Sequence, residues 1–335
     1  MIEARQIQKQ FKIPVVKKGR FSGIRTLFSR EYIIKEAVKE ISFTIKEGDF
    51  VGYIGPNGAG KSTTIKMLTG ILHPTQGEVK IMGLNPHKER RKVVRHLGVV
   101  FGQRTQLWWD LPVIDSYDIL TVMYKLDKKE TEKRLSQLTE LLGLHEFIHT
   151  PVRKLSLGQR MRADIAASLL HDPEILFFDE PTIGLDVIAK KKIRGLLKTL
   201  NKEMKKTVLL TTHDMDDIEQ LCEKVIVIND GQIVYNDSIP QLRNDIGLPT
   251  IMKVSFVGDF QTPTIHHNMI QIIERTNSTI TIQYNRHQMK AMDVLNMMQN
   301  WGEIEDIHMD EPQLEEMIQE IYQTPEASKE SLVVS

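Results

Sequence analysis

The chain has 335 residues, more than one average domain requires, so we expect one large domain and a smaller appendage. Lysine plus arginine number 44, as do aspartate plus glutamate, and this balance gives no reason to expect a nucleic-acid partner. Cys222 is the only cysteine, which excludes an internal disulfide, and no stretch reaches the ~20 consecutive apolar residues that cross a bilayer. We therefore expect a reducing, cytoplasmic location.

A basic segment, Pro14 to Glu31, stands near the N-terminus where the first strands of a hairpin would otherwise be joined tightly. We interpret it as an insertion at about residues 14–35. We interpret this segment first as a solvated loop. Its apolar residues recur at spacings near three and four, so the alternative is a short amphipathic helix that touches anionic headgroups or a membrane protein. The apolar residues are Phe21, Ile24, Leu27 and Phe28, and the basic ones Lys17, Lys18, Arg20, Arg25 and Arg30.

Strand patterns dominate the next part of the chain. Apolar residues alternate with polar ones from Ile41 to Ile45, and an apolar run from Phe50 to Ile54 leads directly into glycines. Further apolar runs predict strands at residues 98–101, 175–178, 208–212 and 225–228. Because helical or loop-rich sequence separates these strands, we expect an α/β core with substantial parallel pairing. Leucines at helical spacing between Thr131 and Leu144 predict a helical insertion between strands.

The pattern changes after about residue 240. Short strands are predicted at residues 252–256 and 279–284, followed by helices at 289–299 and 311–322. We therefore assign residues 1–240 to the large domain, 241–324 to a small α+β accessory domain and 325–335 to a flexible tail.

The stretch from Gly55 to Ser62 fits the full phosphate-binding-loop pattern, with an apolar strand before it and a helix-competent segment after it. Its glycines let backbone N–H groups point inward around phosphates, and the following helix adds its positive N-terminal end. We expect Lys61 to contact the β- and γ-phosphates of ATP and Ser62 to ligate Mg²⁺. The expected ATP-binding residues here are Gly55, Pro56, Asn57, Gly58, Ala59, Gly60, Lys61, Ser62 and Thr63.

A second apolar strand, Ile175 to Phe178, delivers Asp179 and Glu180 to its end, where open α/β sheets place their ligands. We expect Asp179 to reach Mg²⁺ through water and Glu180 to polarise the water that attacks the γ-phosphate. Two acids after an apolar run are, by themselves, typical of a strand entering a solvated turn. The phosphate loop in the same chain favours the catalytic interpretation.

The segment from Leu155 to Gln159 reads Leu-Ser-Leu-Gly-Gln and matches the signature of the ABC ATPases, which the chain resembles over roughly residues 40 to 235. The resemblance implies a P-loop NTPase cassette with a RecA-like core, an antiparallel β subdomain and a helical subdomain. Leu157 replaces the second glycine of the commonest signature. We expect tolerance, because Ser156 and the backbone at Gly158 remain to meet the γ-phosphate. Without this context Ser156 would be an ordinary helix N-cap.

Three further residues match family marks: Gln103 the Q-loop glutamine, Asp186 the D-loop aspartate and His213 the switch histidine. The resemblance implies that Gln103 ligates Mg²⁺ and acts in catalysis with Glu180 and His213. It also implies an aromatic side chain stacked on adenine. Phe11 best matches that position, and Tyr32 is the alternative.

In this family ATP is sandwiched between the phosphate loop of one subunit and the signature of its partner. The resemblance therefore implies that Ser156, Gly158 and Gln159 act in trans, and that the partners are a second ABC ATPase subunit, identical or not, and integral membrane permease subunits. Such a chain would lie on the inner face of the cell membrane. The chain is most similar to bacterial exporter ATPases for drugs and antibiotics, which favours export over import.

Two features leave alternatives open. Trp108 and Trp109 suit a groove that grips a permease helix, but packing of at least one of them in the core is equally compatible with the sequence. A soluble ABC ATPase serving translation or DNA maintenance is the competing function. One cassette and the absence of a long heptad run argue against it.

Overall fold

The structure is a computed structural model that describes residues 1–14, 32–102, 104–261, 270–286 and 288–323. The chain divides into two compact units, Met1–Asn236 and Asp237–Ser335, so the division falls slightly before the residue 240 expected from the sequence. The segment for which a solvated loop and a short amphipathic helix were the two interpretations, residues 21–28, and the tail predicted at 325–335 lie outside the described residues.

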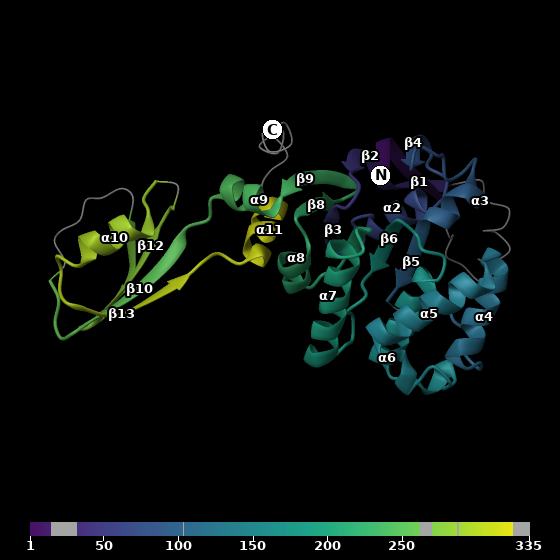
Figure 1. The fold of residues 1–335 in the computed structure, drawn as a ribbon. Coiled ribbons are helices and arrows are strands. Elements are labelled where there is room, and N and C mark those ends of the chain that lie inside the picture. Colours follow the sequence, from purple (N-terminus) through teal and green to yellow (C-terminus); the bar gives the residue numbers. More distant parts are fainter. Residues whose placement is uncertain (15–31, 103, 262–269, 287, 324–335) are drawn as a thin grey trace, which may run out of the picture. The chain divides into compact units, whose positions relative to one another are not determined.

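A six-stranded sheet forms the centre of the first unit, with the strand order β5-β6-β7-β3-β8-β9 (Figure 1). Strands β5, β6, β7, β3 and β8 pair in parallel, which confirms the expected α/β core. Strands β3 and β7 are buried along their whole length, as expected for parallel strands covered on both faces. The bounds are β3 (Phe50–Ile54), β5 (Leu97–Phe101), β6 (Ile175–Asp179), β7 (Thr207–Thr211), β8 (Lys224–Asn229) and β9 (Gln232–Ser238).

Helices connect these strands. Helix α2 follows β3, helix α7 leads toward β7, and helix α8 joins β7 to β8. Their bounds are α2 (Lys61–Leu68), α3 (Arg90–Val93), α7 (Val187–Lys202) and α8 (Met215–Leu221). Short 3₁₀ turns occupy Val94–His96, Leu144–Glu146 and Val152–Lys154.

An antiparallel sheet in the order β2-β1-β4 completes the core of this unit. Its strands are β1 (Ile2–Pro14), β2 (Tyr32–Ile45) and β4 (Gln76–Ile81). Its apolar face packs with β3 and α2 in one hydrophobic cluster. Pro14 pairs with Tyr32, so the two ends of the predicted insertion lie opposite each other. Residues 32–35, which the sequence assigned to the insertion, belong to β2.

Three helices form a helical subdomain beside the six-stranded sheet: α4 (Val113–Tyr124), α5 (Lys128–Leu142) and α6 (Leu157–Leu169) (Figure 1). Helix α6 packs against both α4 and α5. Helix α5 is the one predicted at residues 131–144. It begins early because the Asp127 carboxylate caps its first turn by accepting a hydrogen bond from the Glu130 N–H, and it ends at Gly143 with a φ of +58°.

The second unit contains an antiparallel sheet in the order β11-β12-β10-β13. Helix α10 covers one face of this sheet, where Val294 and Met298 are buried against Met252, Val254 and Ile282. Helix α9 packs against α11. The bounds are α9 (Ile239–Ile246), β10 (Thr250–Phe256), β11 (Ile270–Arg275), β12 (Thr279–Tyr284), α10 (Ala291–Met298), β13 (Ile304–Asp310) and α11 (Leu314–Gln323). The sequence predicted four of these elements, β10, β12, α10 and α11. Among the residues described, no helix has the length and apolarity that crossing a membrane requires.

Candidate ATP site

The phosphate loop, residues 55–62, joins β3 to α2 as the sequence predicted. Gly60 precedes the helix with a φ of +110°, a backbone conformation that favours glycine. A Cβ atom on Gly60 would lie 2.5 Å from the carbonyl oxygen of Ala37 in β2. The loop therefore lies where the two sheets of the first unit meet, and its tight turn requires glycine.

Lys61 lies over the loop that precedes it. Its Nζ atom donates hydrogen bonds to the carbonyl oxygens of Gly55, at 2.6 Å, and Pro56, at 3.1 Å. Burial lowers the pKa of Lys61, and the nearby charges of Glu180 and Asp179 partly oppose that shift. The ammonium group and the two predicted carboxylates therefore share one site.

Asp179 ends β6 and lies opposite Thr211 of β7. The Thr211 hydroxyl donates to one Asp179 carboxylate oxygen at 2.5 Å, and the Ser62 hydroxyl lies 3.5 Å from the other. The sheet register thus holds the carboxylate against the first turn of α2. Hydroxyl and carboxylate oxygens are the ligands that Mg²⁺ prefers, so Ser62 and Asp179 fit this ion.

Glu180 follows with a φ of +57°, which is uncommon for a residue with a side chain. Its N–H donates to the carbonyl oxygen of Thr211 at 2.9 Å, and the Gly102 N–H donates to the carbonyl oxygen of Asp179 at 2.8 Å. A Cβ atom on Gly102 would lie 1.9 Å from the Glu180 carbonyl oxygen. Position 102 must therefore be glycine for Glu180 to keep this conformation.

His213 lies beside Glu180, with its Nδ1 atom 3.5 Å from Glu180 Oε1. The His213 side chain is 64% exposed and the Glu180 side chain 22% exposed, so both can be reached from outside. The structure thus brings together Lys61, Asp179, Glu180 and His213, as the sequence predicted.

The sequence analysis missed a buried carboxylate, Asp217, that is hydrogen-bonded to residues next to this site. Asp217 on α8 is fully buried and accepts hydrogen bonds from the hydroxyls of Thr182, at 2.6 Å, and Thr212, at 3.1 Å. Arg194 of α7 pairs with the same carboxylate. Thr182 lies two residues after Glu180, and Thr212 directly precedes His213. Through these hydroxyls Asp217 joins the segments that carry Glu180 and His213.

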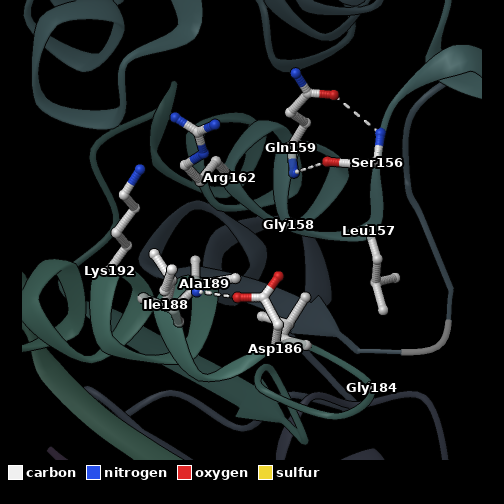
Figure 2. A pocket seen from close by; sticks show the side chains of 12 residues that line it. Ser156, Leu157, Gly158, Gln159, Arg162, Gly184, Asp186, Ile188, Ala189 and Lys192 are labelled. Atoms are coloured by element: carbon white, nitrogen blue, oxygen red, sulfur yellow. Dashed lines mark hydrogen bonds between the residues drawn. The ribbon is translucent and has the colours of Figure 1, made fainter.

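The signature and the D-loop form a second group of residues (Figure 2). Ser156 is the N-cap of α6: its hydroxyl accepts from the Gln159 N–H at 3.2 Å, and the Gln159 side chain accepts from the Ser156 N–H at 2.9 Å. Asp186 caps α7 in the same way, accepting from the Ala189 N–H at 2.8 Å. A groove of about 340 Å³ separates the two helix starts. The N-cap interpretation of Ser156 is thus correct, and it is compatible with a role as signature.

The two groups are separate within one chain. Among the described residues, no hydrogen bond or ion pair joins Ser156 or Gln159 to the phosphate loop. Ser156 and Asp186 are exposed, and Gly158 is half-buried. The signature side chains and the phosphate loop of one chain therefore do not assemble into a single site.

Gln103, the predicted Q-loop glutamine, lies outside the described residues, between the described residues Gly102 and Arg104. Phe11, the predicted adenine contact, lies in β1 and is half-buried.

The pairing of β1 with β2 places the two candidates for the adenine contact, Phe11 and Tyr32, at different distances from the phosphate loop. Lys9 of β1 pairs with Val38, whose side chain lies 3.3 Å from the position of a Cβ on Gly60. Phe11 pairs close to this point of the ladder, whereas Tyr32 pairs at its far end and is 54% exposed. Phe11 is therefore the nearer of the two to the phosphate loop.

Trp108 and Trp109 follow the predicted Q-loop glutamine. They are 38% and 50% exposed, so neither lies in the core, and the core-packing alternative is wrong. The Arg160 guanidinium of α6 lies 5.6 Å from the centre of a Trp109 ring. Trp109 thus contacts the helix that carries the signature.

Known proteins share this architecture. Residues 38–183 match the ABC transporter family. The chain is 34% identical over 209 residues to the ABC transporter ATP-binding protein NatA of Bacillus subtilis, a match covering 62% of this chain and 85% of that protein. It is also 34% identical over 218 residues to the bacitracin transport ATP-binding protein BcrA of Bacillus licheniformis, covering 65% and 70%.

A solved structure supports the same assignment. The dimeric structure of a post-hydrolysis state of an ATP-binding cassette bound to ADP and Pi superposes with a TM-score of 0.60 at 29% identity, covering 71% of this chain and 99% of that one. Together with the phosphate loop and paired carboxylates described above, these similarities show that the chain belongs to the ATP-binding proteins of ABC transporters and is an ATPase.

Proposed function

We propose that this subunit pairs with a second ABC ATPase subunit, that the pair closes on two ATP molecules, and that closure and hydrolysis drive export through separate permease subunits. The separation of the phosphate loop from the exposed Ser156 and Asp186 carries this proposal. Each group holds half of the contacts that the family resemblance assigns to one ATP, and a partner chain supplies the other half.

On the phosphate-loop side, Lys61 and the loop N–H groups bind the β- and γ-phosphates, and Phe11 stacks on adenine. Ser62, Asp179 and Gln103 would hold Mg²⁺, which supplies charge neutralisation for the phosphates when bound. The oxygen ligands that Ser62 and Asp179 offer support this assignment.

On the catalytic side, Glu180 accepts a hydrogen bond from the attacking water and draws its proton toward Oε1, acting as general base. His213 contacts the γ-phosphate and orients the water against Glu180. The 3.5 Å separation of Glu180 Oε1 and His213 Nδ1 supports a shared water or phosphate oxygen beside both side chains. Gln103 completes this catalytic group.

On the partner-facing side, Ser156, Gly158 and Gln159 meet the γ-phosphate of the ATP held by the other subunit. The positive N-terminal end of α6 favours a phosphate at this place. Asp186 sets the start of α7 beside the signature, where the partner subunit approaches.

The membrane partner would contact Trp108 and Trp109. Exposed aromatic side chains are frequent anchors of protein interfaces, and Trp109 lies against Arg160 of the signature helix. Such a contact would place the protein on the inner face of the cell membrane. Export is favoured by the resemblance to bacterial exporter ATPases; the relative BcrA is named for bacitracin transport, a name that gives a transported antibiotic and no direction. Residues 1–240 would form the cassette, and residues 241–324 an accessory domain that supports the dimer or regulates the cycle.

The decisive experiment uses the Glu180→Gln variant of the full chain. We expect it to bind ATP within about twofold of the wild-type affinity, to dimerise with ATP and to lose turnover by about a hundredfold or more, because only the base has been removed. Light scattering with and without ATP measures pairing, and phosphate release measures turnover. Fast turnover by this variant would refute the role of Glu180, and a failure to pair would refute the sandwich.

Purification of the wild-type chain from its native cells distinguishes the transporter from the competing function in translation or DNA maintenance. Co-purification with multi-span membrane proteins supports the transporter. Co-purification with ribosomes or DNA, and not with membrane proteins, would contradict it.

A further inference from the structure

Asp164 on α6 joins the signature helix to the loop that follows Gln103. One carboxylate oxygen, Oδ1, accepts hydrogen bonds from the Thr105 hydroxyl at 2.9 Å and from the Gln106 N–H at 3.0 Å. The Gln106 side chain donates in turn to the backbone carbonyl oxygen of Asp164 at 3.0 Å. These three hydrogen bonds fix the beginning of the loop to the helix that carries Ser156.

The Asp164 carboxylate is held in an unfavourable environment. It is 4% exposed, and the positive charge that favours its ionised form comes from Arg160 on the same helix. Burial raises the pKa of Asp164 to about 6, although the hydrogen bonds from Gln106 and Thr105 and the charge of Arg160 oppose that shift. An apolar side chain would fill the same space without this penalty, so packing alone does not explain a carboxylate here. The acceptor oxygen Oδ1 explains it, because this atom holds the Thr105 hydroxyl and the Gln106 N–H.

We call residues 105–111 the linking loop. Besides its contacts with Asp164, this loop is hydrogen-bonded to the segment that precedes Ser156. The carbonyl oxygen of Trp109 accepts from the Arg153 N–H at 3.0 Å, and that of Leu111 accepts from the Val152 N–H at 3.0 Å. Arg153 also pairs with Asp110 at 2.9 Å. The linking loop is thus bonded both to the segment before Ser156 and to the helix after it, and these parts form one body.

Gly102, which precedes the linking loop in the sequence, is hydrogen-bonded to strand β6. The Gly102 N–H donates to the carbonyl oxygen of Asp179, at the end of β6. Only Gln103 and Arg104 lie in the sequence between Gly102 and the linking loop, so the chain from Gly102 to Thr105 can span at most about 10 Å. If Gly102 moves, the linking loop must therefore move with it, because the two residues between them are too short to compensate for a large displacement.

We propose that Asp164 is a positioning residue that makes the linking loop and the signature helix move together, so that the Mg²⁺ side of one ATP site sets where this chain presents its signature to its partner. The proposal rests on the two-subunit ATP site proposed above. It assigns Asp164 a task in communication between the two sites and none in the chemistry.

The test compares four variants of the full chain. Asp164→Ala removes the acceptor, Asp164→Asn keeps an oxygen at Oδ1, and Thr105→Val removes one donor with little change of shape. Ser168→Ala is the matched control, because Ser168 is also buried on α6 but its hydroxyl bonds only to the Ile165 carbonyl of its own helix. ATP affinity, ATPase kcat and ATP-driven pairing in the Glu180→Gln background are measured for each.

We expect all four variants to bind ATP within about twofold of wild type, because the phosphate loop is untouched. In Asp164→Ala, kcat falls about tenfold or more and pairing weakens by a similar factor, and Thr105→Val shows a smaller loss in the same direction. Asp164→Asn and Ser168→Ala stay within about threefold of wild type. A merely structural role would lower the amount of folded protein and leave the kcat of the folded fraction unchanged.

Two results would overturn the proposal. One is a kcat and pairing of Asp164→Ala within about twofold of wild type. The other is an Asp164→Asn as impaired as Asp164→Ala, which would make charge, and not the acceptor, the relevant property. If Asp164→Ala does not fold, Thr105→Val decides: unchanged kcat and pairing reject the coupling. Failure of Glu180→Gln itself to pair would instead refute the two-subunit site, and with it both proposals.

Discussion

Gly102 and Glu180 are in backbone contact: the space that a side chain at position 102 would occupy is filled by the carbonyl oxygen of Glu180, at 1.9 Å from an ideal Cβ. Gly102→Ala must therefore displace the backbone that carries the proposed general base. We expect kcat to fall about tenfold or more while ATP affinity changes less than about threefold, because Lys61 and its loop are not touched. Steady-state phosphate release and equilibrium ATP binding measure the two quantities.

Gly195 on α7 is the matched control. A Cβ there meets nothing within 4 Å, so Gly195→Ala should leave turnover unchanged and raise the free energy of unfolding by up to about 1 kcal/mol. A normal kcat for Gly102→Ala would show that the backbone contact does not position Glu180.

Asp217→Ala should damage both stability and turnover. It leaves the Thr182 and Thr212 hydroxyls without their buried acceptor and removes one partner of Arg194, which keeps its pairing with Asp214. We expect the free energy of unfolding to fall by about 2–4 kcal/mol and kcat to fall with it, because the segments beside Glu180 and His213 lose a common anchor. Denaturant unfolding and phosphate release provide the measurements.

Asp216 provides the comparison for this prediction. Its carboxylate is 72% exposed and lies 3.9 Å from Arg194, so Asp216→Asn should change the free energy of unfolding by less than about 0.5 kcal/mol. Equal stability of the two variants would mean that Asp217 is not the anchor described here.

The sequence predicted the parts of the site that are local. The phosphate loop lies between an apolar strand and a helix, and Asp179 and Glu180 end a second apolar strand, so their neighbourhood on a parallel sheet follows from strand polarity. The structure brings these residues together with His213. In the second unit, β10 and β12 alternate cleanly and were predicted, with burial on every second residue.

The missed features depend on residues distant in sequence. Asp164 and Asp217 read as ordinary helix-surface acids, and only tertiary packing buries them against Thr105 and Thr182. The requirement for glycine at position 102 arises from a chain segment far away. Strand β13 was missed because its side chains are mostly polar and exposed, so period-two burial does not mark it.

Leu157, the departure from the commonest signature, packs against the D-loop. A Cβ on Gly184, whose φ is +72°, would lie 3.1 Å from a Leu157 methyl carbon, and Figure 2 shows the leucine side chain directed toward Gly184. Leu157→Gly should lower the free energy of unfolding by about 1–2 kcal/mol through lost packing and added backbone freedom. ATPase kcat should stay within about threefold, because the donors of Ser156 and Gly158 remain.

Thermal or denaturant unfolding and phosphate release test this prediction together. A loss of turnover in Leu157→Gly larger than about tenfold would mean that the leucine itself takes part in the closed site. A Gly184→Ala variant checks the contact from the other side, since it introduces both strain at a positive φ and crowding of Leu157.

Asp164 should make the stability of the cassette depend on pH in a defined direction. Burial raises its pKa in the folded chain to about 6, above the value of an unfolded aspartate near 3.9. Between these values the folded state holds a proton that the unfolded chain has released, so the contribution of Asp164 to stability is greatest at low pH and is lost as pH rises through about 6. Asp164→Asn cannot ionise. Its free energy of unfolding relative to wild type should therefore rise by about 2 kcal/mol between about pH 4.5 and 7.5. Denaturant unfolding of both proteins at both pH values gives this double difference. The contributions of all other titrating groups cancel in it, because the two proteins share them. A difference that is constant with pH would show that the Asp164 carboxylate keeps its ordinary pKa in the folded chain.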